Sequence, residues 1–237
     1  MIFSFLKNIA LFLFDLIDLY YHQKNIKNFL NKEKIKIDVL FDVGSHMGTY
    51  TDLILRNNNN LKAYLFEPQS KIFERIKKKY KDNDNILTFN LGVSDEETTK
   101  ELFINLHDLT STFSDFNKKS KYLNLKAKLY GSSISNMSHE KETVKTITLD
   151  KFILENNLES IDLMKIDTEG HELKVIKGLE KKIDVVKNIL IEFHHRDVFS
   201  DYNPEEIHNF LINHGFKLTK VFNFPFSWQD RFYSKKS

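Results

Sequence analysis

The chain has 237 residues, of which 41% are hydrophobic and 29% are charged, and its formal net charge is +2. This length suits one well-buried α/β domain and is short for two. The small net charge argues against nucleic acid as a partner, and the lack of cysteine excludes disulfides, thiolate metal sites and a cysteine nucleophile. Together these properties are typical of a globular domain in a reducing cytoplasm.

Residues 1–21 are rich in Phe, Leu and Ile. Lys7, Asp15 and Asp18 interrupt the apolar run well short of a bilayer span, and no small-residue cleavage site follows it. At about 100° per residue the polar side chains share one narrow arc, which predicts an amphipathic helix. Such a helix can dock on its own domain, lie peripherally on a membrane or pair with a second subunit as a homodimer, and the sequence leaves all three open.

Residues 22–36 are polar and Lys-rich, and we expect a second helix followed by a solvated link. We therefore divide the chain into an N-terminal helical extension, 1–36, and a domain, 37–237. The domain alternates strand and helix patterns, which is typical of a mostly parallel sheet with helices on both faces. Strands are predicted at 37–43, 62–67, 86–91, 100–105, 142–147, 162–167, 185–193, 216–221 and 226–233, and helices at 48–56, 70–80, 149–156, 173–180 and between Asn203 and Gly215.

The first chemical signal is an acidic strand end that leads into a glycine turn. Open parallel sheets bind ligands at the carboxyl ends of their strands. A dinucleotide fingerprint needs glycine at its first, third and sixth positions, which hold Gly44, His46 and Thr49 in this chain, so no pyrophosphate is expected. Glu67 closes the second strand, where an acid can hold the two hydroxyls of a ribose. A ribose without a pyrophosphate fits S-adenosylmethionine, and the expected contacts are Asp42, Gly44, Ser45, His46, Gly48 and Glu67.

The turn after the third strand carries Ser94 and Asp95. These residues either contact the adenine edge of the cofactor or simply cap the turn, and the sequence favours neither role.

Acids and histidines follow two later strands. Asp167 ends one of them and Glu192 ends the other, so both carboxylates are expected beside the cofactor. They are candidates to accept a proton from an acceptor hydroxyl or to bind a divalent metal such as Mg²⁺. His171 and His194 are further candidates for the proton-accepting role. The alternative for residues at the start of the next helix is that they only cap it, and for Glu172 we favour that role.

These motifs identify a resemblance to the FkbM family of methyltransferases. It rests on Phe41-Asp42-Val43-Gly44-Ser45-His46-Met47-Gly48, Phe66-Glu67-Pro68, Asn90-Leu91-Gly92-Val93-Ser94-Asp95, Thr148-Leu149-Asp150 and Met164-Lys165-Ile166-Asp167-Thr168-Glu169-Gly170-His171-Glu172. The resemblance implies a class I methyltransferase fold, a Rossmann-like sheet of seven strands, and O-methylation of a sugar, glycan or related small molecule. It departs from the family where His46-Met47 replaces asparagine–isoleucine. The serine-rich motif of the family corresponds either to Thr110-Ser111-Thr112 or to Ser132-Ser133.

Other functions were weighed against this one. A methyltransferase of nucleic-acid bases usually carries Asn/Asp-Pro-Pro-aromatic after its fourth strand, where this chain has Asp167-Thr168-Glu169-Gly170. The missing glycines argue against a Rossmann oxidoreductase. A non-catalytic S-adenosylmethionine-binding interaction protein and a methyltransferase for a lipid or nucleic-acid acceptor stay open. The polar stretch 106–141 is expected to cover the acceptor, and we expect an enzyme of glycan or polysaccharide biosynthesis.

Overall fold

The computed structural model describes residues 22–105, 111–121, 123–124, 138–195, 197–223 and 228–235. The predicted amphipathic helix at 1–21 lies outside the described residues, as do residues 224–227 between the last two strands. Of the helices within the described part of the chain, none is both long enough and apolar enough to cross a membrane.

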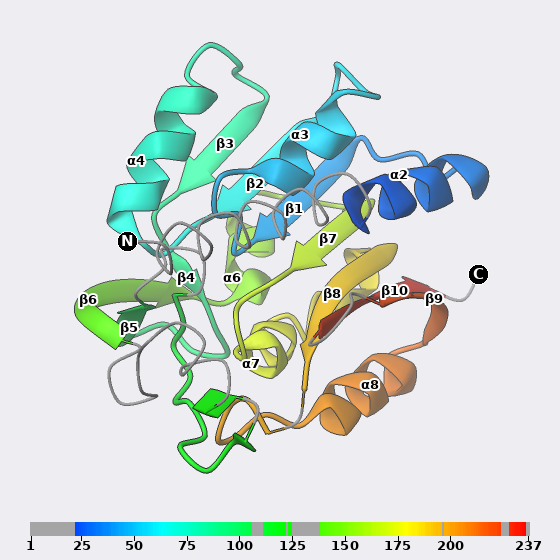
Figure 1. Ribbon diagram of the computed structural model, residues 1–237. Helices are drawn as coiled ribbons and strands as arrows, with labels where there is room; N and C mark the ends of the chain where they lie inside the picture. The colour runs from blue at the N-terminus through cyan, green and yellow to red at the C-terminus, as the bar shows by residue number, and fades with distance from the viewer. Residues whose placement is uncertain are drawn as a thin grey trace, which may run out of the picture.

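A seven-stranded sheet forms the centre of the molecule (Figure 1). Its order is β3-β2-β1-β7-β8-β10-β9, in which β10 pairs antiparallel with both neighbours and the first five strands pair in parallel. The strands are β1 (Val39–Val43), β2 (Lys62–Phe66), β3 (Ile86–Phe89), β7 (Leu163–Ile166), β8 (Asn188–His194), β9 (Phe216–Asn223) and β10 (Trp228–Lys235). The predicted class I methyltransferase fold is confirmed.

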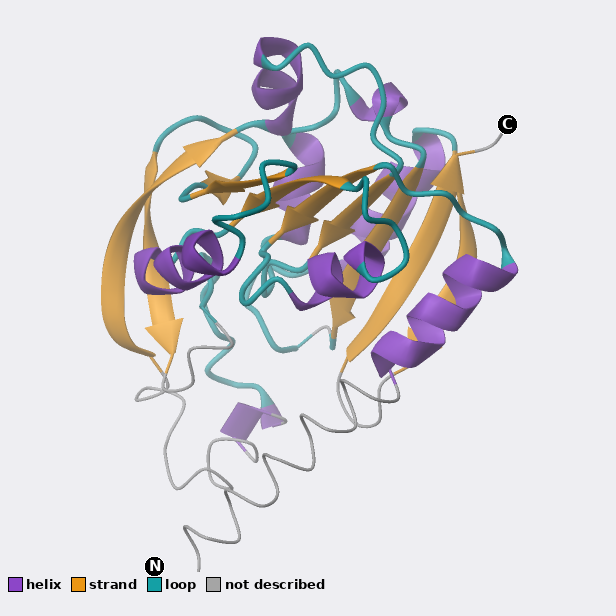
Figure 2. Cartoon of the chain, turned by 90° about the horizontal axis from the view of Figure 1, so that it is seen from above, coloured by secondary structure: helices purple, strands orange, loops and turns teal. Residues whose placement is uncertain are grey.

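Helices cover both faces of this sheet (Figure 2). Successive strand residues point to opposite faces, so Phe41 and Val43 pack in one core while Leu40 packs in the other. The first core is closed by α6 (Leu149–Glu155), α7 (Glu172–Lys177) and α8 (Pro204–Asn213). The second core is closed by α2 (Gln23–Lys32), α3 (Thr49–Leu55) and α4 (Ser70–Lys79).

A second, three-stranded sheet lies beside the first one (Figure 1). Its order is β4-β6-β5, from β4 (Gly92–Val93), β6 (Ser138–Ile147) and β5 (Thr99–Asn105). β6 begins four residues earlier than the sequence predicts, because its first residues continue the antiparallel pairing with β5.

Local signals fixed several element ends as expected. The side chain of Asn203 accepts a hydrogen bond from the backbone N–H of Glu206, Pro204 begins α8, and Gly215 follows its end at φ 83°. Residues 216–223 and 228–235 pair as the predicted hairpin strands. The strand predicted from residue 185 begins only at Asn188, because Ile183–Val185 form a single 3₁₀ turn.

The helix predicted within 22–36 is confirmed as α2, and one face of it is buried in spite of its polar sequence. Ile26 is 0% and Leu30 5% exposed, and both belong to the second core. His22 and Gln23, at its start, are also buried. The N-terminal extension therefore supplies part of the packing of the domain.

Candidate active site

A pocket opens at the carboxyl ends of β1, β2 and β7, where the topology of the sheet predicts a ligand. The small sheet supplies a further wall through β4 and β5. The lining residues are Val43, Gly44, His46, Phe66, Glu67, Pro68, Gln69, Leu91, Gly92, Val93, Leu102, Ser111, Phe113, Asp167, Thr168 and Glu169.

The turn after β1 brings the backbone close to the ends of its neighbouring strands. The N–H groups of Gly44 and Ser45 donate to the carbonyl of Phe66, at 3.0 and 3.1 Å. Gly44 has a φ of 76°, and a Cβ atom there would overlap the carbonyl oxygen of Asp167. Glycine is therefore required at position 44 both for its backbone angle and for the close approach of β7.

Glu67 lies in the pocket with its carboxylate held in place. One oxygen accepts the N–H of His46 and the other accepts the N–H of Gln69, each at 2.9 Å. Burial raises the pKa of Glu67 to about 7, although these two N–H groups act against the shift. An ionised carboxylate accepts about four hydrogen bonds, so both oxygens retain capacity for the hydroxyls of a ribose.

Asp42 lies next to the pocket but is not among its lining residues. Its carboxylate accepts the hydroxyl of Thr51 at 2.7 Å, and burial raises its pKa to about 6. Ser45 is also buried, and its Oγ has no hydrogen-bond partner among the described residues. His46 lines the pocket and adopts a φ of 43°. Gly48, at φ 69°, starts α3 behind the turn.

Ser94, Asp95 and His171 form a separate group outside the residues that line the pocket. The hydroxyl of Ser94 contacts Nε2 of His171 at 3.0 Å, and Asp95 pairs with Lys174 at 2.8 Å. Burial lowers the pKa of His171 to about 4, so its ring is neutral. The predicted roles of Ser94 and Asp95 in cofactor binding, and of His171 in catalysis, gain no support from this placement.

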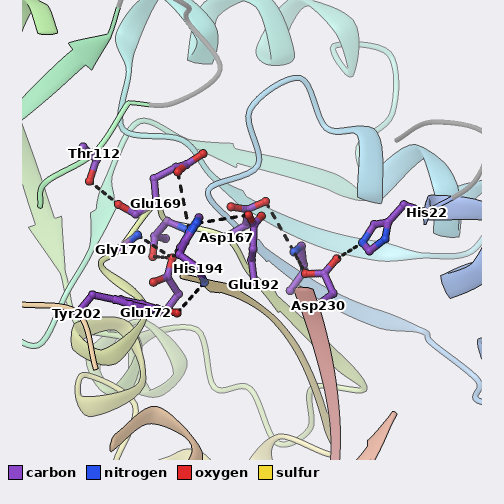
Figure 3. Close-up of polar contacts among 12 residues, drawn as sticks. His22, Thr112, Asp167, Glu169, Gly170, Glu172, Glu192, His194, Tyr202 and Asp230 are labelled. Carbon is purple, nitrogen blue, oxygen red and sulfur yellow. Dashed lines mark hydrogen bonds and ion pairs between the residues drawn. The ribbon is translucent and has the colours of Figure 1, made fainter. Parts of the chain in front are cut away.

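Asp167, which follows β7, and Glu192, two residues before the end of β8, lie close to each other (Figure 3). Asp167 lines the pocket, and its side chain is 28% exposed. Glu192 is 12% exposed, and burial together with the nearby Asp167 and Glu169 carboxylates raises its pKa well above the ordinary value. A carboxyl group with a raised pKa is a stronger base when it ionises.

His194 lies among carboxylates. Its Nε2 is 3.8 Å from Glu172 and 3.9 Å from Glu169, and its Nδ1 is 3.7 Å from Glu192. Burial opposes protonation, but the Glu172 and Glu169 carboxylates outweigh it and raise the pKa of His194 to about 9. The imidazole is therefore a cation at neutral pH and cannot accept a further proton there.

Glu172 is the first residue of α7, but its carboxylate bonds the turn before the helix and does not cap the helix, so the capping role favoured from the sequence is wrong. Its Oε1 accepts the N–H groups of Thr168 and Gly170, at 3.0 and 3.1 Å, and the residue is fully buried. These bonds hold the turn between β7 and α7 in place. The turn is tight, since the backbone has positive φ at both Glu169 and Gly170.

Part of the polar stretch 106–141 closes over the pocket. The hydroxyl of Ser111 donates to Gln69 at 2.9 Å, and the hydroxyl of Thr112 donates to the carbonyl of Glu169 at 2.5 Å. Ser111 and Phe113 are lining residues. Ser111 and Thr112, from one of the two candidate serine-rich motifs, thus lie at the pocket. The other motif, Ser132-Ser133, falls outside the described residues.

Three buried residues, Lys165, Asp230 and His22, adjoin this site and have no role predicted from the sequence. The Nζ of Lys165 lies 2.8 Å from Asp230 and 3.7 Å from Asp167, and Asp230 also accepts a hydrogen bond from His22 at 2.8 Å. The available signal was a lysine inside an otherwise apolar strand, since a buried cation needs a carboxylate partner.

The arrangement does not favour a metal at Asp167 and Glu192. The part of the chain that the structure describes has no group of three or more His, Asp or Glu side chains suited to a metal ion. The Lys165 ammonium already places a positive charge beside Asp167. No step is assigned to a metal, and metal dependence stays a prediction.

The comparisons with known proteins agree with this geometry. The family model described as the methyltransferase FkbM domain matches residues 42–218. The chain belongs to the FkbM methyltransferase family. Its matched region begins at the carboxyl end of β1 and contains both Glu67 and the acids of β7 and β8.

Among curated relatives of this FkbM chain, the hexuronic acid methyltransferase AglP of Haloferax volcanii is 24% identical over 173 residues. The match covers 73% of this chain and 62% of AglP. The AMB antimetabolite synthetase AmbE of Pseudomonas aeruginosa is 25% identical over 204 residues, which cover 76% of this chain and 10% of AmbE. The chain thus spans less than two thirds of the length of either relative.

Solved structures show weaker likeness to this FkbM chain. Precorrin-6y C5,15-methyltransferase from Geobacter metallireducens has a TM-score of 0.48 at 12% identity, and the match covers 90% of this chain and 88% of that one. Fibrillarin from Aeropyrum pernix, in complex with S-adenosyl-L-methionine, also has a TM-score of 0.48, at 9% identity, covering 83% and 66%.

Proposed function

We propose that this chain transfers the methyl group of S-adenosylmethionine to a hydroxyl of a sugar, glycan or related small molecule. The observation that carries the proposal is the adjacency of two chemistries at one sheet edge. Glu67 offers a ribose-binding carboxylate in the pocket, and Asp167 and Glu192 offer acids directly beside it. The hexuronic acid activity of AglP supports a sugar as the acceptor class.

Different residues of the pocket would contact different parts of S-adenosylmethionine. Glu67 would accept the ribose hydroxyls, while His46 and the backbone at Gly44 would lie against the rest of the cofactor. S-adenosylmethionine supplies an electrophilic methyl group on a sulfonium. The chain's own task is then to align the acceptor oxygen in line with that methyl and to remove one proton.

Glu192 is the residue we propose as the proton acceptor. A sugar hydroxyl is a very weak acid, so a carboxylate with a raised pKa is better matched to it than an ordinary one. Asp167, which lines the pocket, would orient the hydroxyl. The protonated His194 would stabilise the negative charges of the carboxylates around its ring, those of Glu169, Glu172 and Glu192.

The test is an assay with S-adenosylmethionine carrying a ¹³C-labelled methyl group and a panel of uronic acids, neutral sugars and nucleotide sugars. We expect release of S-adenosylhomocysteine and a product whose methyl carbon resonance is that of a methyl ether. A methyl ester or a methylamine product would overturn O-methylation of a hydroxyl. Binding of S-adenosylhomocysteine without turnover on any acceptor would favour the non-catalytic alternative. Undiminished turnover in the presence of a chelator would remove the predicted metal.

Variants assign the roles. Glu192→Gln should lower kcat by about 100-fold, the scale of a lost general base, and leave the affinity for S-adenosylhomocysteine unchanged. Asp167→Asn should raise KM for the acceptor as well as lower kcat. If Glu192→Gln retains full kcat, another group removes the proton.

A further inference from the structure

A buried bridge runs from the N-terminal helix to the acids of the proposed acceptor site. His22, at the start of α2, donates from Nε2 to Oδ2 of Asp230 on β10, at 2.8 Å. The other oxygen of Asp230 accepts the ammonium of Lys165 on β7, also at 2.8 Å. Figure 3 shows His22 and Asp230 side by side, next to Glu192 and Asp167.

Asp230 is held from three elements at once. Tyr50 of α3 donates its hydroxyl to the same oxygen as His22, at 2.7 Å. The side chains of His22, Asp230 and Lys165 are 3%, 2% and 1% exposed. Since water cannot replace these bonds, the orientation of the Asp230 carboxylate is set by its protein partners.

The orientation of Asp230 in turn places Lys165. The ammonium lies 3.7 Å from Asp167 and 4.5 Å from the centre of the Tyr50 ring. In the β8–β10 register, Asp230 stands opposite Glu192. The Lys165 ammonium is therefore held by Asp230 of β10 and lies beside Asp167, one of the two proposed catalytic acids.

We propose that His22 is a positioning residue of the acceptor site, acting through Asp230 on the Lys165 ammonium. The proposal rests on the methyl transfer proposed above for what Asp167 and Glu192 do. The FkbM family model matches residues 42–218, which include neither His22 nor Asp230. The bridge thus links His22, which precedes the matched region, and Asp230, which follows it, to Lys165 within it.

The experiment compares His22→Leu with two variants. His22→Gln keeps an amide N–H that can donate to Asp230, and Leu30→Ala is the matched control. Leu30 lies on the same helix, is 5% exposed and belongs to the second core, so its truncation loosens α2 without touching Asp230. For each variant we would measure kcat, KM for the acceptor, the affinity for S-adenosylhomocysteine, and the thermal midpoint.

We expect His22→Leu to lower kcat about ten-fold, since misplacement of a reacting group is costly, with the affinity for S-adenosylhomocysteine unchanged. His22→Gln should recover most of kcat. Leu30→Ala should lower the thermal midpoint and leave kcat unchanged at a temperature where it is folded. Equal kcat in His22→Leu and the wild type would overturn the proposal. So would a loss that His22→Gln fails to restore, or one that Leu30→Ala reproduces, because His22 would then act by packing alone.

A second readout does not depend on turnover. The ¹⁵N side-chain signal of Lys165, assigned by its loss in Lys165→Arg, should be protected from solvent exchange in the wild type and in His22→Gln. It should exchange faster in His22→Leu. Unchanged exchange in His22→Leu would overturn the bridge itself. If the wild type transfers no methyl group to any acceptor, the proposed function fails, while this signal still decides whether His22 positions Lys165.

Discussion

At the scale of single residues, Glu67 connects sequence, geometry and binding most directly. Its position at the end of the second strand predicted a ribose contact, and the structure places it in the pocket with two backbone N–H groups on its oxygens. Because its pKa is raised to about 7, the carboxylate is ionised above that pH and protonated below it.

The first prediction concerns the pH dependence of cofactor binding. The affinity of the wild type for S-adenosylhomocysteine should fall as the pH decreases from 8 to 6, because protonation removes an acceptor for the ribose hydroxyls. Glu67→Gln should bind about 10-fold more weakly at pH 8, corresponding to about 1.4 kcal/mol for a lost charged hydrogen bond, and its affinity should vary less with pH. Isothermal titration across this range is the measurement. Identical heats for both proteins would show that Glu67 does not contact the ligand.

The second prediction concerns His194 and stability. Its pKa rises from 6.5 to about 9 in the folded protein, so the folded state binds the proton more tightly than the unfolded chain does. The resulting stability is fully present below pH 6.5 and is lost as the pH rises through about 9. Denaturant unfolding should therefore show a difference between the wild type and His194→Gln that shrinks from pH 6 to pH 9.5. A difference that grows over this range would contradict the protonated state.

Residues also mark the limit of what the sequence could predict. The acids at Asp167 and Glu192 were found because strand ends converge in parallel sheets. Lys165 was not, since its partner Asp230 lies 65 positions away on a strand whose register depends on the whole sheet. His194 was considered as a base, but only the folded arrangement reveals the two carboxylates that keep it charged.

At the scale of elements, hydrophobic periodicity predicted the order of strands and helices correctly. It misplaced the ends of several of these elements. The predicted end of α7 at residue 180 and the predicted start of β8 at 185 both miss by three residues. A 3₁₀ turn, Ile183–Val185, lies between them and takes in Val185, which the periodicity assigned to the strand. The polar composition of α2 likewise hides its buried face, because two apolar residues one turn apart are enough to anchor it.

The third prediction compares two glycines at element boundaries. Both Gly44 and Gly215 have positive φ, but a Cβ atom at Gly215 would make only an ordinary contact, at 3.8 Å, with the side chain of Lys235, whereas one at Gly44 would overlap the backbone of Asp167. Gly215→Ala should therefore cost about 1–2 kcal/mol of unfolding free energy, the conformational term alone. Gly44→Ala should cost more and also weaken S-adenosylhomocysteine binding, because β1 and β7 must separate. Urea unfolding with parallel titrations measures both, and equal costs would mean that the close approach is unimportant.

At the scale of the whole molecule, side chains on the two sides of the boundary predicted at residue 36 pack in the same hydrophobic core. α2 covers the second core with Ile26 and Leu30, and it supplies His22 to the buried bridge. Among the described residues, the part of the extension from His22 onward packs against the domain, as the other covering helices do.

The fourth prediction is the effect of removing residues 1–36. The remaining chain, 37–237, keeps every residue that lines the pocket, so it should still bind S-adenosylhomocysteine. It loses the burial of two aliphatic side chains, at about 1.5–3 kcal/mol each, and its thermal midpoint should fall by roughly 10 °C for a domain of this size. Differential scanning calorimetry with and without S-adenosylhomocysteine gives both quantities. An unchanged midpoint would show that α2 contributes nothing to the stability of the domain.

The position of β10 has a consequence for biosynthesis. This strand, residues 228–235, is inserted between β8 and β9, although it is made after both of them. Until β10 has been made, the sheet of the nascent chain lacks one strand between β8 and β9. Lys165 then lacks the Asp230 carboxylate with which it pairs. Domains generally fold as units as the chain emerges, and this one can complete its sheet only after β10 has been made.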